Sequence, residues 1–238
     1  MRIGVIADIH GDVDALRDAL AQVDRIGCDL VLCAGDVVGH GPFPEETVAL
    51  LRERCVPCVR GNRDRWALGD HGAEPSPGGA EGRHDASGSS LSHTARQFLL
   101  NLPRSWHGLL GGVRVGMYHG TPLSEMEGVF LQQATGQAIR RWLELAGADV
   151  LIVGHSHEPF RLLGPGRGVV VNPGALFRKP LWEPDGAAMV LDPKTGSFRK
   201  IAKPPTGTFG VLELPSRGFT VYSASDGTEV EIPRVTMY

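Results

Sequence analysis

The chain has 238 residues, of which 42% are hydrophobic and 21% charged, and its formal net charge is −3. The near-neutral charge argues against a dedicated nucleic-acid binder, which carries a strong positive field. No window approaches the roughly 18 consecutive apolar residues of a membrane span, and the N-terminus lacks the long apolar run of a signal peptide. We therefore expect one domain over residues 1–238, located in the cytoplasm and without a membrane partner.

The first half of the chain alternates short apolar runs with amphipathic stretches, which is typical of βαβ units around a mostly parallel sheet. Asp12 is the expected N-cap of the first helix and Gly27 its end. The expected strands are 3–7, 30–34 and 57–60, and the expected helices are 12–23 and 45–54.

The cysteines of this half lie in or beside these apolar runs, so we expect reduced and mostly buried thiols. Cys55 and Cys58 form a CxxC pair, but the pair lies in a predicted strand rather than at the start of a helix. A redox role is therefore not expected.

Residues 69–90 are rich in Gly, Ser, Pro and charge and have no apolar period, which predicts an irregular surface excursion that could cover a site. The pattern then predicts a helix, a hairpin turning at Gly111–Gly112, a second helix and a buried strand. Their ranges are 91–102, 105–110 with 113–119, 136–147 and 150–154.

Short strand-like runs separated by turn residues fill the rest of the chain and suggest a second sheet built of hairpins. The C-terminal segment 203–238 either extends this sheet or forms a dimer contact, and the sequence leaves both open. The runs are 160–163, 168–172, 187–192, 198–202, 211–215, 219–223 and 228–233.

Polar residues follow directly after the predicted buried strands, where the loops of an α/β sheet converge on one crevice. A single His or Asp at such a place is more often a cap or a surface residue, but five strand ends share this feature. Asp-x-His and His-Ser-His would place two side chains on the same side of an extended segment. The candidates are Asp8, His10, Asp36, Asn62, Asp64, His119, His155 and His157.

Imidazole, carboxylate and amide oxygen ligands suit Mn²⁺, Fe, Zn²⁺, Co²⁺ or Ni²⁺, and a shared carboxylate can hold two such ions about 3.5–4 Å apart. No Cys occupies these positions, so a structural thiolate zinc site is not expected. The pattern predicts a centre for divalent metal ions.

The ordered motifs DIHGD (8–12), AGDVVGHGP (34–42), VRGNRD (59–64), YHGTP (118–122), GHSH (154–157) and NPGA (172–175) resemble the calcineurin-like metallophosphoesterase superfamily. The resemblance covers about residues 1–192. Within the superfamily, the chain is similar to the small prokaryotic phosphodiesterase-like branch. It implies a four-layer α/β/β/α sandwich with two mixed β-sheets, followed here by a β-rich extension.

The resemblance also implies a role for each candidate. Asp8, His10, Asp36 and His157 would bind one metal ion, and Asp36, Asn62, His119 and His155 the other. Two divalent ions, Mn²⁺ first, would activate a shared water or hydroxide for in-line attack on phosphorus. Asp64 would orient a neighbouring ligand, and Asn172 would shape the floor of the site.

Arg63 departs from the family pattern, in which most relatives carry a His that is thought to protonate the leaving group. Arginine cannot act as a general acid near neutral pH, although its planar guanidinium can bind a phosphate oxygen. His40 is a candidate for the missing acid, and a loop role for His40 is an equal alternative. We therefore expect a preference for esters with good leaving groups.

Three hypotheses about function follow from these motifs. The first is a metal-dependent phosphodiesterase acting on a nucleotide or small phosphodiester. The second is a phosphatase for phosphoproteins or dinucleoside polyphosphates. The third is a metal-bound scaffold with little turnover, suggested by Arg63 but disfavoured because all seven ligand positions are filled.

Overall fold

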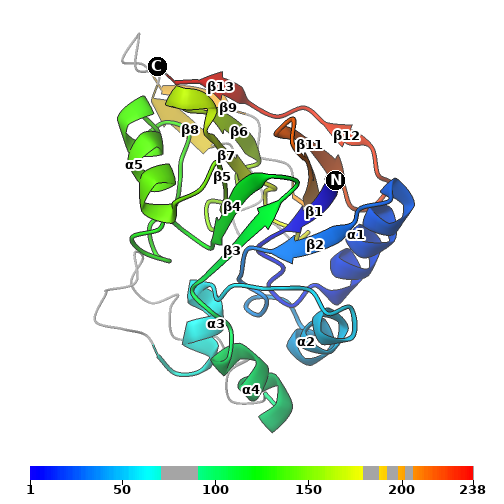
Figure 1. Ribbon diagram of the computed structural model, residues 1–238. Helices are drawn as coiled ribbons and strands as arrows, with labels where there is room; N and C mark the ends of the chain where they lie inside the picture. The colour runs from blue at the N-terminus through cyan, green and yellow to red at the C-terminus, as the bar shows by residue number, and fades with distance from the viewer. Residues whose placement is uncertain (71–90, 179–187, 192–197, 202–205, 238) are drawn as a thin grey trace.

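The computed structural model describes residues 1–70, 91–178, 188–191, 198–201 and 206–237. Helices lie on both outer sides of two β-sheets, with α1 and α2 on one side and α5 on the other (Figure 1). Among the described helices, none is long and apolar enough to cross a membrane.

The first sheet has five strands in the order β12-β11-β10-β1-β2. β1 is parallel to β2 and antiparallel to β10, so the sheet is mixed. Its strands are β1 (Arg2–Ile6), β2 (Leu30–Cys33), β10 (Thr208–Glu213), β11 (Gly218–Ser223) and β12 (Glu229–Val230).

The second sheet has six strands in the order β13-β6-β7-β5-β4-β3. β4, β5 and β7 are parallel, whereas β3 and β6 run antiparallel to their neighbours β4 and β7. Its strands are β3 (Ser105–Leu110), β4 (Val113–Tyr118), β5 (Val150–Ile152), β6 (Phe160–Leu163), β7 (Val169–Asn172) and β13 (Arg234–Thr236). A separate hairpin pairs β8 (Ala188–Leu191) with β9 (Phe198–Ile201).

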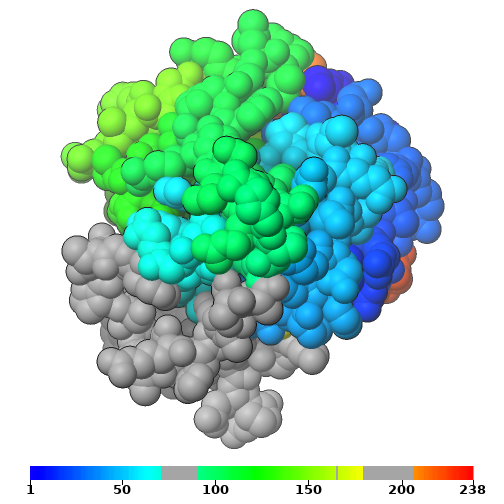
Figure 2. Space-filling model, turned by 90° about the horizontal axis from the view of Figure 1, so that it is seen from below, coloured from blue at the N-terminus to red at the C-terminus, as the bar shows by residue number. Residues whose placement is uncertain are grey.

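The helices begin and end at residues that favour these positions. Asp12 accepts a hydrogen bond from the Ala15 amide at the start of α1, and Gly27 ends α1 with a left-handed φ of 74°. The helices are α1 (Val13–Ile26), α2 (Pro44–Glu53), α3 (Asn62–Ala67), α4 (His93–Leu100) and α5 (Gly136–Ala146), with a 3₁₀ turn η2 (Pro165–Arg167). Seen from below, α3 and α4 lie between the blue N-terminal part and the green middle part of the chain (Figure 2).

Three apolar clusters lie between four layers: α1 with α2, the first sheet, the second sheet, and α5. One packs α1 against the first sheet through residues such as Leu16 and Ile6, and a second fills the space between the sheets with residues such as Val5 and Ile152. The third packs α5 against the outer face of the second sheet. This arrangement confirms the predicted α/β/β/α sandwich with two mixed sheets.

One sequence prediction was wrong, and two were only partly right. Residues 57–60 form only an isolated bridge between Cys58 and Cys33, because the chain turns into the unpredicted helix α3 directly afterwards. The short runs after residue 154 do form the antiparallel pairs β6–β7, β8–β9 and β10–β11, but these pairs belong to three different sheets and not to one second sheet. The segment 203–238 divides between the sheets: β10–β12 extend the first and β13 the second.

Candidate metal centre

The predicted ligands meet where β1, β2, β4 and β5 end. Asp36 lies close to side chains from two other strand ends, and every predicted ligand contacts another one. Five are buried, whereas His155 and His157 are partly exposed. All seven are therefore brought together: Asp8, His10, Asp36, Asn62, His119, His155 and His157.

The backbone of these turns is not extended, contrary to the sequence prediction. Five of the seven residues have φ between 51° and 66°, the left-handed region that L-residues other than Gly, Asn and Asp rarely adopt. The side chains therefore converge because the backbone turns sharply after each strand, and not because strand side chains alternate. The five are Asp8, His10, Asp36, His155 and His157.

The first half of the centre consists of Asp8, His10 and His157. His10 Nε2 lies 3.1 Å from His157 Nε2, and His157 Nε2 lies 3.4 Å from Asp8 Oδ1. Asp36 faces this half with Oδ2, which is 3.9 Å from His10 Nε2. Two nitrogens and two carboxylates thus point at one small volume.

The second half consists of Asn62, His119 and His155. Asn62 Oδ1 lies 3.0 Å from His119 Nε2 and 2.9 Å from His155 Nδ1, and the two nitrogens are 3.2 Å apart. Asp36 faces this half with its other oxygen, Oδ1, at 3.4 Å from His119 Nε2. Asp36 therefore lies between the two halves.

This donor set fits a cation. His119 Nδ1 lies 2.8 Å from the Ala34 carbonyl oxygen, which can only accept, so Nδ1 carries a proton. When this imidazole is neutral, the lone pair of Nε2 faces Asn62 Oδ1. Acceptors that face each other in a buried site are unfavourable unless a positive charge lies between them.

Burial and neighbouring charges shift the pKa values of the ligands in different directions. Burial raises the pKa of Asp36 to about 6, and the nearby Asp8 charge contributes to this. Burial lowers the pKa of His155 to about 3, with further lowering by the charges of His119 and Arg63. For His119, burial lowers the pKa, but the charges of Asp36 and Asp8 outweigh it and the net direction is upward.

Asp8 takes part in both halves, which the sequence did not predict. Its carboxylate can group with His10 and His157, and also with Asp36 and His119. Both carboxylate oxygens also lie within 3.2 Å of the His155 backbone amide, which donates to them. Burial raises the pKa of Asp8, yet His157 above all lowers it, and the net direction is downward.

The Asp64 carboxylate forms hydrogen bonds with backbone amides rather than with the side chain of a predicted ligand. Its carboxylate accepts hydrogen bonds from the Val38 and Gly61 amides at 3.0 and 2.9 Å. It thereby joins the loop after Asp36 to the start of α3. Burial and the Asp36 charge raise the pKa of Asp64 to about 7.

Gly61 allows the two loops to approach closely, because a Cβ at this position would collide with the Asp36 carboxylate.

Asn172 supports the turn that carries His155 and His157. Its Nδ2 donates to the Gly154 carbonyl at 2.9 Å and to Ser156 Oγ at 3.1 Å.

Arg63 and His40 lie at the edge of the centre. The Arg63 guanidinium carbon is 4.8 Å from the centroid of the Trp66 ring. The exposed His40 ring is 5.2 Å from the ring of His10, and Phe177 packs against both histidines. Phe177 was not predictable from the sequence, because an apolar residue after NPGA cannot be distinguished from a core residue.

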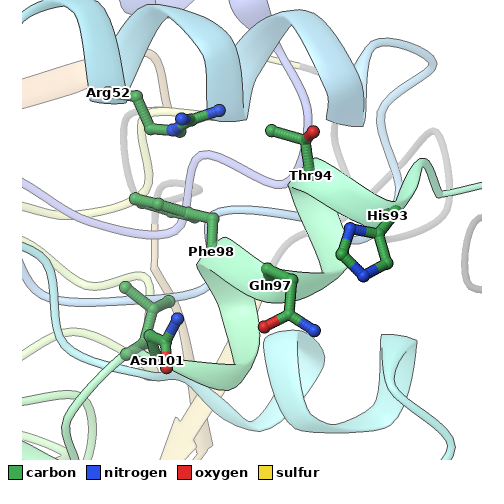
Figure 3. Close-up of a pocket in the computed structure, with 7 residues that line it drawn as sticks. Arg52, His93, Thr94, Gln97, Phe98 and Asn101 are labelled. Atoms are coloured by element: carbon green, nitrogen blue, oxygen red, sulfur yellow. The ribbon is translucent and has the colours of Figure 1, made fainter.

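A surface cavity of about 410 Å³ lies elsewhere, between α2 and α4. Figure 3 shows Arg52 of α2 opposite Thr94 and Phe98 of α4. None of its lining residues is a predicted ligand. His93 lies on its rim, whereas His71, His84 and nearly all of the predicted 69–90 excursion fall outside the described residues.

Comparison with known proteins places this chain in a family. Residues 1–196 match the calcineurin-like phosphoesterase superfamily domain. A probable metallophosphoesterase of Methanothermobacter thermautotrophicus is 30% identical over 200 residues, which are 81% of this chain and 87% of that protein. An uncharacterized protein of Methanocaldococcus jannaschii is 28% identical over 163 residues, and the match spans 66% of this chain but only 63% of that protein.

The crystal structure of a metallophosphoesterase from Sphaerobacter thermophilus has the same fold. Its TM-score is 0.61 at 22% identity, with 98% of this chain and 89% of that chain covered. The family uses divalent metal ions, and the described residues include two groups that could hold them. The chain therefore belongs to the calcineurin-like phosphoesterase superfamily and is a phosphoric ester hydrolase.

Proposed function

We propose that the protein is a phosphodiesterase with two divalent metal ions. Asp8, His10 and His157 would hold one ion, Asn62, His119 and His155 the other, and Asp36 both. One observation carries this proposal: the Asp36 carboxylate directs one oxygen toward each half, at 3.9 Å from His10 Nε2 and 3.4 Å from His119 Nε2. Two ions that share a carboxylate are typical of enzymes that hydrolyse phosphate esters.

When bound, such ions lower the pKa of a water molecule and neutralise charge that develops on the phosphoryl oxygens. Mn²⁺ is the first expectation, and Fe, Zn²⁺, Co²⁺ or Ni²⁺ would suit the same ligands. The protein then needs to supply position and charge but no nucleophile. The left-handed turns and the buried Asp64 keep the ligand side chains fixed for this purpose.

Arg63 would bind a phosphate oxygen of the substrate. Its charge lowers the pKa of His155 and His10, after the larger effects of burial and neighbouring histidines, so the guanidinium acts on the centre. Because arginine cannot donate a proton to the leaving group, His40 is the candidate acid. Esters whose alkoxide leaves readily should react best.

The test is hydrolysis of bis-p-nitrophenyl phosphate and p-nitrophenyl phosphate by metal-stripped protein that is resupplied with Mn²⁺. Asp36→Asn is the matched control, since it keeps the shape and removes the shared charge. Activity that requires metal and disappears in Asp36→Asn is expected, with the diester cleaved faster. No activity with any of the five metals, despite two bound ions, would favour the binding scaffold.

The leaving-group proposal needs its own measurement. Aryl esters should be cleaved well and alkyl esters poorly by the natural protein, and Arg63→His should narrow this difference. Equal turnover of both ester types would contradict the proposal. His40→Gln should reduce turnover of alkyl esters more than that of aryl esters.

The substrate class stays open within the family. Nucleotides and small phosphodiesters are our first expectation, while phosphoproteins and dinucleoside polyphosphates are alternatives that analysis of the reaction products would separate. A nucleic-acid substrate lacks support from charge, which is −3 overall. The cytoplasmic location and the single domain remain predictions.

A further inference from the structure

We propose that Glu125 is a positioning residue for the second half of the metal centre. It lies on the loop 120–128, between β4 and α5, and acts through α3, which carries Asn62. This inference rests on the proposed two-metal function. No motif pointed to Glu125, and its role follows from three contacts of this loop.

The loop begins and ends at the second half. It starts immediately after His119, and its last residue, Gly128, packs so closely on His155 that a Cβ there would lie 2.8 Å from His155 Cδ2. Between these ends the loop is folded onto itself. The Thr121 amide donates to the Ser124 and Glu127 carbonyl oxygens, each at 3.0 Å. The loop therefore has a defined shape and fixed ends.

The middle of the loop reaches the third ligand. Glu125 is only 7% exposed, and its carboxylate lies 2.9 Å from Arg65 Nη1 and 3.7 Å from Arg60 Nη2. Arg60 precedes Asn62 by two residues, and Arg65 follows it by three on α3. Glu125 thus contacts the chain on both sides of Asn62.

The position of α3 depends on polar contacts such as those of Glu125. It has only six residues, and Asn62, Asp64 and Ala67 are its buried members, so apolar packing contributes little to its position. Asp64 fixes its start from inside the protein through the Gly61 amide. Glu125 fixes it from the opposite end of the same short segment, through Arg65.

A buried carboxylate with two arginines is a weak source of stability, because desolvation offsets most of the attraction. The position of Glu125 is better suited to aligning the ligands of the second half than to stabilising the fold. The loop links all three ligands of the second half: His119 by sequence, His155 through Gly128, and Asn62 through Glu125. Outer groups that orient ligands commonly change metal affinity about 10–100-fold when they are removed.

The experiment is a titration of the full-length, metal-stripped protein with Mn²⁺ by isothermal calorimetry, with bound metal counted by mass spectrometry. The natural protein should bind two ions. Glu125→Gln should keep one affinity and weaken the other about tenfold or more. Glu144→Gln, an exposed carboxylate on α5, is the matched control and should leave both affinities unchanged.

A second variant controls for misfolding of Glu125→Gln. Arg65→Lys keeps the charge next to Glu125 but loses the planar guanidinium, so it should fold and weaken the same ion by a smaller factor. Excess Mn²⁺ should restore turnover in both variants, which a general loss of structure would not allow.

The outcomes separate the two proposals. A natural protein that binds one ion would overturn the two-metal function, and the role of Glu125 with it. Two ions in the natural protein together with unchanged or equally reduced affinities in Glu125→Gln would overturn only the role of Glu125.

Discussion

The two halves of the metal centre are positioned by different means. In the first half all three ligands sit on turns with left-handed φ, and His157 keeps 22% of its side chain exposed. In the second half only His155 has such a φ, and the side chain of His119 is fully buried. Left-handed turns therefore shape more of the first half than of the second, although both halves join segments that are distant in the sequence.

This difference separates what short motifs can encode from what the fold must supply. The turns of the first half are short segments whose residues, such as Gly11 with its φ of 79°, allow sharp backbone geometry. The second half needs α3 and the loop 120–128, which meet only in the folded chain. Substitutions should therefore affect activity in both halves, but stability mainly in the second.

The largest effects should come from His157→Ala and His119→Ala. Both variants remove a nitrogen of the centre, so each should lower kcat/KM more than about 100-fold, beyond the effect of losing an outer partner. His119→Ala should cost more stability than His157→Ala, about 1–3 kcal/mol, because it leaves the buried Ala34 carbonyl without its 2.8 Å partner.

Denaturant unfolding of the metal-free proteins measures this contrast without the contribution of bound metal. His157→Ala should cost less than His119→Ala because its side chain is partly exposed, but it should still cost some stability because it removes the partner of the buried Asp8 carboxylate. Equal destabilisation by the two variants would contradict the proposed difference between the two halves.

Asp64→Asn tests the link between the two loops that meet at Asp36. The carboxylate accepts from the Val38 and Gly61 amides with separate oxygens, whereas an amide side chain would turn a donor toward one of them. One buried N–H would lose its partner, at about 1–3 kcal/mol. Thermal unfolding should show a Tm lower by several degrees, and an unchanged Tm would contradict this role.

Most of the fold was predictable from periodicity. α1 and α5 have apolar faces at helical spacing with a cap at each end, and the buried strands β1, β2 and β5 are short apolar runs. Partner strands were not predictable, because a run such as that of β10 is equally compatible with either sheet. Its pairing with β1 is decided by packing between segments about 200 residues apart.

The centre was predictable in its residues but not in its geometry. Motifs identify all seven side chains, yet they do not reveal that Asp8 reaches both halves or that Asn62 begins a helix. Glu125 and Phe177 carry no pattern of their own, since a lone Glu in a loop and a Phe after a turn are common everywhere. Their roles depend on tertiary contacts.

Phe177→Leu should have a moderate effect, confined to the first half. The Phe177 ring meets the His10 ring edge-on with centroids 5.8 Å apart, and its amide donates to the Asp8 carbonyl. Leucine keeps most of the volume but not the flat contact, so one Mn²⁺ affinity should fall by up to about tenfold. A calorimetric titration in which both affinities fall equally would show that Phe177 supports the whole centre.

The smallest effect should come from Asp149→Asn, at the end of the second sheet away from both halves. Its hydrogen bond with Arg114, at 3.1 Å, lowers the pKa of Asp149 in the folded protein. A lowered pKa contributes stability that is present above the unfolded value of about 3.9 and is lost as the pH falls through the folded value. The Tm of Asp149→Asn should therefore be lower by no more than about 4 °C at pH 7, and the difference should vanish by about pH 2–3. Measured without metal, a difference that persists at low pH would show that packing, and not the charge, accounts for it.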